Sequence, residues 1–180
     1  MKIRTEQLLG IALDWVVVKC EGIDVVVLTP EEQRDRWFEY APREDLEKER
    51  TNFDMYIAPT LKPKLCVLED DGYKRYPRHS EARMLFNQGP PQFQFSSSWA
   101  QAGPILDREE IGVRRNAPCS KGREWEALPS ITAKGAGGRA GYGPTPLIAA
   151  MRCYVAAKMG DEIDVPDELT EPYWSGNHDY

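Results

Sequence analysis

Hydrophobic residues near the start of the chain recur at steps of three and four positions, which predicts an amphipathic helix over residues 5–21. Thr5 is a suitable N-cap for this helix, and Gly22 is a suitable terminator. The apolar, β-branched residues 23–29 then predict a strand, which Pro30 ends. The hydrophobic repeat of the helix consists of Leu8, Ile11, Ala12, Trp15 and Val16.

A second helix is predicted near the end of the chain, with Thr145 as N-cap and Pro146 as its first residue. Gly160 marks its end. Its hydrophobic stripe comprises Leu147, Ile148, Met151, Val155 and Met159.

Between these helices the signals are shorter. Alternating or β-branched runs predict strands near residues 54–58, 64–68, 93–95, 111–115 and 163–165. A turn at Asp70-Asp71-Gly72 predicts a hairpin that joins the 64–68 strand to residues 73–76. A helix is predicted over residues 100–110, with a short further helix near 81–86.

Residues 31–52 are crowded with charge and predict an exposed helical excursion that Pro42 interrupts. One interpretation is a solvated insertion. The alternative is that its aromatic residues, Trp37, Phe38 and Tyr40, dock it on the core or line a pocket.

Residues 116–143 end in a glycine-rich run and predict a flexible loop without strong secondary structure, and the tail over 170–180 is expected to be mobile. Taken together, the pattern predicts one domain over residues 1–180 of the α+β class. In it, a small antiparallel β-sheet packs with two or three amphipathic helices, and the charged segment is an expansion.

Composition narrows the functional classes. Hydrophobic residues make up 41% of the chain and charged residues 29%, which is typical of a globular protein. A formal charge of −6 argues against general binding to nucleic acid polymers, although a local basic pocket stays open. The first residues do not resemble a signal peptide, and no apolar run is long enough to span a membrane. We therefore expect a cytoplasmic protein.

Catalytic and cofactor chemistry have little support. The four cysteines form no CxxC pair, and with only His79 and His178 beside them we expect no zinc site and no histidine base. There is no phosphate loop of the GxxxxGK type, and the glycine run at 135–141 follows no convincing strand. The sequence thus favours a binding protein without catalytic residues, metal or cofactor.

Two segments are candidates for ligand binding. The first is the helix start at Thr145, where the free N–H groups of Leu147 and Ile148 favour an anion and Gly143 permits close approach. Arg139 adds a charge-assisted donor and Tyr142 a stacking face. The alternative interpretation is a loop followed by an ordinary cap.

The second segment lies at the start of the predicted 100–110 helix. Here Trp99 offers a face for stacking on a base, while Ser98 and Gln101 offer a hydroxyl and an amide. The alternative is that Ser98 caps the helix and Trp99 belongs to the core.

Three blocks of the chain resemble the NinX family of phage and prophage proteins. They are residues 8–22 (LLGIALDWVVVKCEG), 98–109 (SWAQAGPILDRE), and 143–152 (GPTPLIAAMR) continuing to 158–162 (KMGDE). The blocks cover roughly a third of the chain in the family's order, and residues 31–95 lie outside them. The family supplies a phage origin without an assigned activity.

The middle block is also distantly similar to phage sponge proteins that counter Thoeris defence, although Gly103 stands where those proteins carry an aspartate. This resemblance implies an oligomer that sequesters a nucleotide-derived immune signal, such as a cyclic ADP-ribose-like molecule or a cyclic oligonucleotide, in the host bacterial cytoplasm. Two alternatives stay open: a protein that binds and modulates a host protein through residues 31–52, and an enzyme that processes a nucleotide.

Overall fold

The computed structural model describes residues 1–40, 50–51, 54–55, 62–67, 93–117, 120–129 and 139–170. The chain divides into two compact units, one formed by residues 1–24 and 93–171, the other by residues 25–92 and 172–180. The described elements are helices and small antiparallel sheets, which confirms the predicted α+β class. Each unit is described by itself below.

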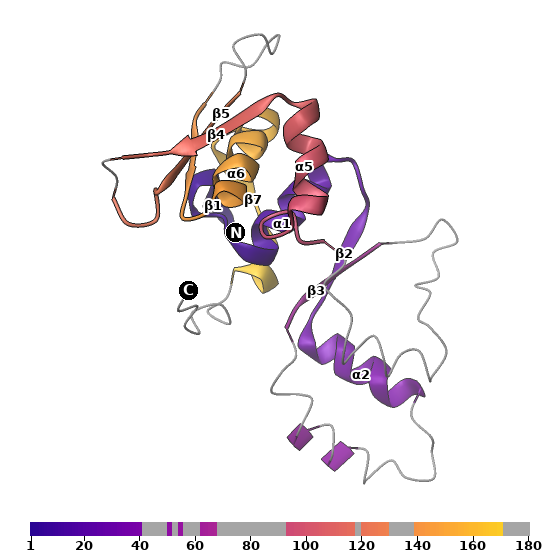
Figure 1. Cartoon of the computed structure of the whole chain (residues 1–180). Coiled ribbons are helices and arrows are strands. Elements are labelled where there is room, and N and C mark those ends of the chain that lie inside the picture. Colours follow the sequence, from indigo (N-terminus) through magenta and orange to yellow (C-terminus); the bar gives the residue numbers. More distant parts are fainter. Residues whose placement is uncertain are drawn as a thin grey trace. The chain divides into compact units, whose positions relative to one another are not determined.

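Helix α6 (Pro146–Met159) is the centre of the first unit (Figure 1). Residues 149–155 are all buried, so the helix is covered on almost every side. It packs against the three-stranded sheet and helices α1 (Gly10–Cys20) and α5 (Trp99–Arg108). Its start agrees with the prediction, because the Thr145 hydroxyl accepts a hydrogen bond from the Ile148 N–H at 3.2 Å. Its end at Gly160 is also confirmed.

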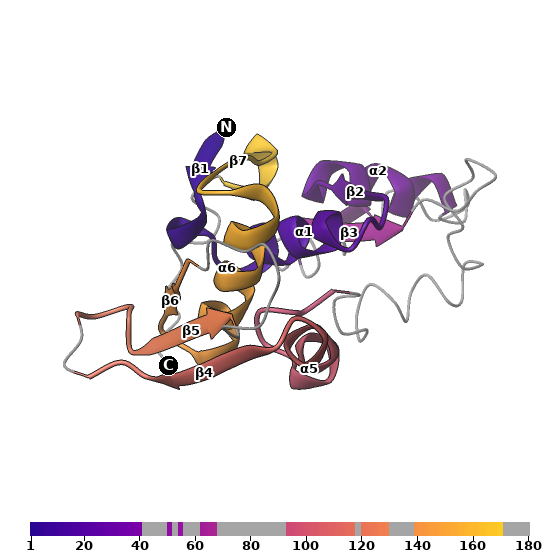
Figure 2. The ribbon, with the colours of Figure 1, turned by 90° about the horizontal axis from the view of Figure 1, so that it is seen from above.

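The three-stranded sheet has the order β4-β5-β6 and is antiparallel throughout (Figure 2). Its strands are β4 (Ile111–Arg115), β5 (Trp125–Pro129) and β6 (Gly141–Gly143). The first matches its predicted range. The other two correct the prediction that residues 116–143 lack secondary structure, because both strands pair in the sheet and contact α6.

Two glycines explain how β6 approaches α6 so closely. A Cβ atom built on Gly141 would collide with the backbone of Ala149 and Cys153. One built on Gly143 would lie 2.8 Å from the Ala149 nitrogen, closer than real Cβ contacts. The sequence interpretation assigned this glycine-rich approach to a ligand; in the structure it serves contact between β6 and α6.

The same unit contains a second sheet, which has two strands. Strand β1 (Lys2–Arg4) pairs antiparallel with β7 (Glu162–Asp164), which overlaps the strand predicted at 163–165. A 3-10 turn, η1 (Thr5–Gln7), follows β1, and another, η5 (Asp167–Leu169), follows β7. The predicted helix start at Thr5 is therefore wrong. The Thr5 hydroxyl donates instead to the Gly160 carbonyl at 2.7 Å, and α1 begins at Gly10.

The segment before α5 is a turn, although the alternation of Phe93 and Phe95 predicted a strand. A buried carboxylate holds this turn, because the Ser96 N–H donates to Asp14 Oδ1 on α1 at 2.7 Å. The two phenylalanine rings stack on each other with centroids 6.0 Å apart. A carboxylate distant in sequence thus replaces the strand partner that the alternation implied.

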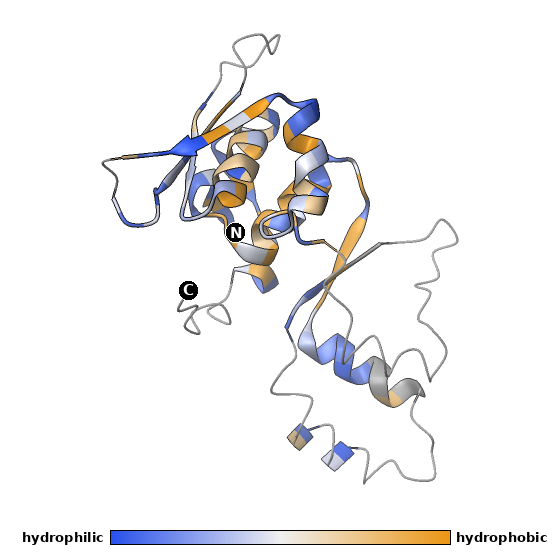
Figure 3. Ribbon diagram, viewed as in Figure 1, coloured by the Kyte–Doolittle hydropathy of each residue, from blue (hydrophilic) through white to orange (hydrophobic). Residues whose placement is uncertain are grey.

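The second unit contains strands β2 (Val25–Leu28) and β3 (Lys64–Val67), which pair antiparallel, and helix α2 (Pro30–Tyr40). Both strands agree with predicted ones. The first part of α2 is hydrophilic in Figure 3, as the charged excursion predicted. Buried Gln33 joins the elements by donating to the carbonyls of Leu28 and Lys62 at 3.0 and 2.7 Å.

Other expectations for the second unit fall partly or wholly outside the described residues. These are Pro42, the strand partner at 73–76, the helix at 81–86 and residues 171–180 of the tail. The strand predicted at 54–58 is wrong where it can be compared, because Asp54 and Met55 are in a helical turn of the π type.

Candidate functional site

Arg152 interrupts the apolar surface of α6. Its side chain is only 7% exposed, and burial lowers the pKa of its guanidinium to about 10. Nε donates to the Leu8 carbonyl at 3.0 Å, and one terminal nitrogen donates to the Tyr142 carbonyl at 2.7 Å. No carboxylate pairs with Arg152 among the residues that the structure describes. The Glu6 carboxylate acts on Arg152 through its charge, but burial outweighs this effect. A buried guanidinium whose described hydrogen-bond partners are carbonyls favours an anion beside it.

Arg152 lines a cavity of about 500 Å³ in the first unit. The walls come from β1, η1, β6, α6, the start of β7 and the turn before β5. Four arginines and three carboxylates contribute to the lining, so its charge balance differs from that of the acidic chain. The lining residues are Arg4, Thr5, Glu6, Arg123, Arg139, Ala140, Gly141, Tyr142, Arg152, Ala156, Asp161 and Glu162.

An arginine stacked on a tyrosine forms part of the wall. The Arg123 guanidinium lies 4.1 Å from the centroid of the Tyr142 ring. The Tyr142 hydroxyl donates to Glu126 at 3.1 Å, and Arg114 donates to the other oxygen of this carboxylate at 2.6 Å. These bonds fix the tyrosine ring and leave the Arg123 side chain, which is exposed, without a carboxylate partner in the described part of the chain.

Another arginine of the cavity, Arg139, is neutralised within the protein. Arg139 forms a close ion pair with Asp161, and both side chains are more than half exposed. The carbonyl of Arg139 accepts a bond from the Cys153 thiol at 3.4 Å, and that of Asp161 accepts one from the Thr5 N–H at 2.8 Å. The ion pair therefore joins the segment before β6 to the segment after α6.

The structure brings two of the predicted site residues, Arg139 and Tyr142, into this cavity. Gly143 and Thr145 are not among its lining residues: Gly143 packs on α6, and Thr145 caps the helix. The cap occupies the Ile148 N–H that sequence analysis treated as free. The anion-binding groups assembled here are arginine side chains instead of the helix start.

The three residues predicted at the start of α5 lie outside the cavity lining. Trp99 is 54% exposed, so the alternative that placed it in the core is wrong. Ser98 is the N-cap by position, but its hydroxyl makes no capping bond. The Gln101 side-chain oxygen accepts the Gln94 N–H at 2.8 Å and so holds the turn that precedes the helix.

Sequence reasoning missed Arg123 and Arg152, the two arginines of the cavity that form no ion pair with the described residues. Arg152 left a detectable signal, because it is the one charged residue in the otherwise apolar run 147–157. Arg123 left none, since it lies in a polar turn whose position depends on how β4 and β5 pair.

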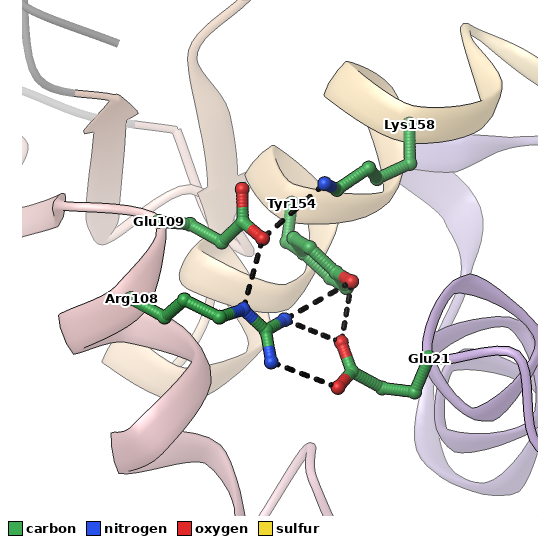
Figure 4. A network of polar contacts seen from close by, with 5 residues as sticks. All are labelled: Glu21, Arg108, Glu109, Tyr154 and Lys158. Atoms are coloured by element: carbon green, nitrogen blue, oxygen red, sulfur yellow. Dashed lines mark hydrogen bonds and ion pairs between the residues drawn. The ribbon is translucent and has the colours of Figure 1, made fainter.

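Another polar cluster lies between α1, α5 and α6 (Figure 4). Arg108 donates to both oxygens of Glu21, at 3.0 and 2.6 Å, and the Tyr154 hydroxyl donates to Glu21 at 2.5 Å. The bonds from Arg108 lower the pKa of Glu21, and burial together with Glu21 raises that of Tyr154. Glu109 and Lys158 complete the cluster at 3.2 Å. Its charges satisfy one another, so we assign it to the packing of the three helices.

The described residues contain no group of three or more histidines, cysteines or acids arranged to hold a metal ion. Within the same residues, no helix has the length and apolar character that crossing a membrane requires.

The sequence matches the protein family described as Bacteriophage P22, NinX, over residues 4–158. This chain belongs to that family. The match runs from the last residue of β1 to the penultimate residue of α6. It includes ten of the twelve residues that line the cavity, all but Asp161 and Glu162. No curated protein matches the chain. The family description names no activity.

Proposed function

We propose that this NinX-family protein binds a nucleotide-derived small molecule through its phosphate groups in the arginine-lined cavity. The ligand belongs to the class of immune signals such as cyclic ADP-ribose-like molecules or cyclic oligonucleotides. The protein sequesters it in the host cytoplasm without converting it, and thereby counters a bacterial defence. The immune role rests on the resemblance of residues 98–109 to sponge proteins, and the binding chemistry rests on the cavity.

The observation that carries the binding proposal is the buried guanidinium of Arg152. A guanidinium has five N–H donors, of which backbone carbonyls take two here. A phosphate in the cavity supplies the missing negative charge and accepts the donors that the described residues leave open. Burial destabilises the charged form of Arg152 and so lowers its pKa, and a bound anion would offset this destabilisation.

The remaining groups fit the other parts of a nucleotide. Arg123 adds a cation at the wall, and its planar group on Tyr142 forms a surface on which a base can stack. The cavity volume of about 500 Å³ lies within the range of small-molecule sites. Among the described residues the lining includes neither histidine nor cysteine, which favours holding a ligand over chemistry that needs a histidine base or a thiol.

Titration calorimetry with ADP-ribose, cyclic ADP-ribose and a cyclic dinucleotide tests the binding step. We expect at least one to bind, and we expect Arg123→Ala to weaken that binding about tenfold because one charge-assisted contact is lost. Arg34→Ala in the second unit is the matched control: it removes the same charge from an exposed arginine outside the cavity. Equal effects of both variants, or no binding of any of the three, would contradict the proposal.

Sequestration needs a second experiment, with protein purified from cells whose nucleotide-signalling defence is active. Heat denaturation should release an intact signal, which mass spectrometry identifies. Release of an altered molecule would indicate an enzyme. An empty protein would favour a host-protein partner, to be sought among proteins that copurify with it. The sponge resemblance also predicts a homo-oligomer, which light scattering on the same preparation measures.

A further inference from the structure

The carboxylates of the cavity call for an explanation of their own, because they repel the phosphate that the arginines attract. Glu6, Asp161 and Glu162 all line the cavity beside its four arginines. Two of them have partners: Asp161 pairs with Arg139, and Glu6 lies 3.9 Å from Arg4. A site built only to hold an anion gains nothing from an additional unpaired acid.

Glu162 is that additional acid. It is exposed, and it makes no ion pair or side-chain hydrogen bond with the residues that the structure describes. Its backbone is held in place, because Glu162 is the β7 residue that pairs with Arg4 on β1. The carboxylate therefore stands on a fixed strand at the cavity with its acceptor sites open.

The acids and the unpaired cations come from different walls. Glu6 belongs to η1, Asp161 directly precedes β7, and Glu162 is the first residue of β7. The basic and aromatic groups come from other elements: Arg123 from the turn before β5, Tyr142 from β6 and Arg152 from α6. A ligand that meets both walls needs an anionic part and a part rich in hydroxyl donors.

We infer that Glu162 accepts hydrogen bonds from the ribose hydroxyls of the ligand, so that the cavity selects ribonucleotides over 2′-deoxyribonucleotides and over free phosphates. This inference rests on the proposed function and names the substrate class of the same cavity. A carboxylate oxygen is the acceptor that proteins use for a ribose 2′-hydroxyl in dinucleotide sites, where the hydroxyl replaces a bond to water. A phosphate bound at Arg152 and Arg123 leaves the sugar as the part of a nucleotide that can reach the acidic wall.

The inference separates two effects of Glu162 that have opposite signs. As a charge, Glu162 repels every phosphate, so Glu162→Gln should strengthen the binding of pyrophosphate. As a hydroxyl acceptor, it favours only ligands that carry the 2′-hydroxyl. The ratio of dissociation constants for dADP and ADP cancels the repulsion, because the two nucleotides carry the same phosphate charge.

The experiment is calorimetric titration of the full chain with ADP, dADP and pyrophosphate. We expect ADP to bind the wild-type protein at least about fivefold more tightly than dADP, and Glu162→Ala, which removes the acceptor, to bring the ratio close to one. Glu168→Ala, at an exposed acid of η5 outside the cavity, should leave the ratio unchanged. Asp161→Asn should strengthen the binding of both nucleotides equally, because it removes the carboxylate that pairs with Arg139.

Each outcome bears on one of the two proposals. A wild-type ratio near one, or a ratio that Glu162→Ala does not change, overturns the ribose inference while the anion cavity stands. Failure of ADP, dADP and pyrophosphate alike to bind overturns the cavity assignment and the ribose inference together. A ratio that falls in Glu162→Ala and not in Glu168→Ala supports the inference.

Discussion

Arg152 and Tyr154 lie two residues apart on α6 and point to opposite sides of the helix, since each residue turns an α-helix by about 100°. On the side of Tyr154, Arg108 shares its charge with Glu21, and this bond raises the pKa of Arg108. On the side of Arg152, the guanidinium donates hydrogen bonds to carbonyls and to no carboxylate among the described residues, and burial lowers its pKa to about 10.

The contrast shows how to separate a packing cluster from a binding site that uses the same residue types. Both clusters combine basic side chains, a tyrosine and acids. The cluster of Figure 4 satisfies its charges internally and joins three helices. The cavity leaves the charges of Arg152, Arg123 and Glu162 open toward a space of about 500 Å³. Open charge beside a cavity is the property that a ligand can use.

The largest effect on stability is expected in β6, which contributes Gly141 and Tyr142 to the wall of the cavity. Gly141→Ala places a methyl group against the α6 backbone at Ala149 and Cys153, so β6 must move. We expect a loss of about 3 kcal/mol in the free energy of unfolding, measured by urea denaturation. Gly112→Ala on β4, whose added atom would lie 4.0 Å from its nearest neighbour, is the control and should cost far less. Similar losses in both variants would show that β6 is not tightly packed.

The next effect is a pH dependence of the free energy of unfolding, which comes from Asp14 on α1. Burial raises the pKa of Asp14 to about 6, from 3.8 in the unfolded chain. Between these values the folded state binds more protons than the unfolded state, so the contribution of Asp14 to stability rises as the pH falls from 7 to 4. Its upper limit is about 3 kcal/mol. The difference in unfolding free energy between wild type and Asp14→Asn should therefore shift in favour of wild type toward acid; no shift would contradict the buried position of Asp14.

Glu21 of the packing cluster should respond with the opposite sign. Its pKa is lowered by Arg108, so its contribution is present above the unfolded pKa of 4.5 and is lost as the pH falls below it. Wild type should accordingly lose its advantage over Glu21→Gln in acid. Chemical denaturation at pH 7 and pH 4 measures both differences, and a common sign for Asp14 and Glu21 would refute the assignment.

A smaller loss is expected from Tyr154→Phe, which removes the hydroxyl that donates to Glu21. We expect a cost of about 1.5 kcal/mol, because the lost bond is to a charged acceptor. A double-mutant cycle with Glu21→Gln should show non-additive losses, since the two residues share one bond. Ligand affinity should not change. A change in affinity without a change in stability would remove the distinction between the two sides of α6.

The smallest effect on stability is expected from Arg123→Ala. Arg123 is exposed and its described side-chain contact is with the Tyr142 ring, so the unfolding free energy should change by about 0.5 kcal/mol or less. The same variant is expected to weaken ligand binding. A large loss of stability together with unaltered binding would place Arg123 in the packing and not in the site.

Prediction from sequence succeeded where the signal was local. Thr145, Pro146 and Gly160 fixed the bounds of α6, and the pattern of residues 111–115 matched β4. It failed for β5 and for β6. These strands are short, and β6 consists of two glycines around Tyr142, so neither carries a periodic pattern. Their pairing follows from packing on α6, which involves residues distant in the chain.

The candidate site divides along the same line. The sequence by itself determined the α+β class, the family and two members of the cavity, Arg139 and Tyr142. Only the tertiary structure placed them beside Arg123, Arg152 and Glu162. It also showed that the Thr145 hydroxyl caps its own helix. The physical reason is that caps and turns depend on neighbours within four residues, whereas an unpaired buried charge is recognised only once every element around it is in place.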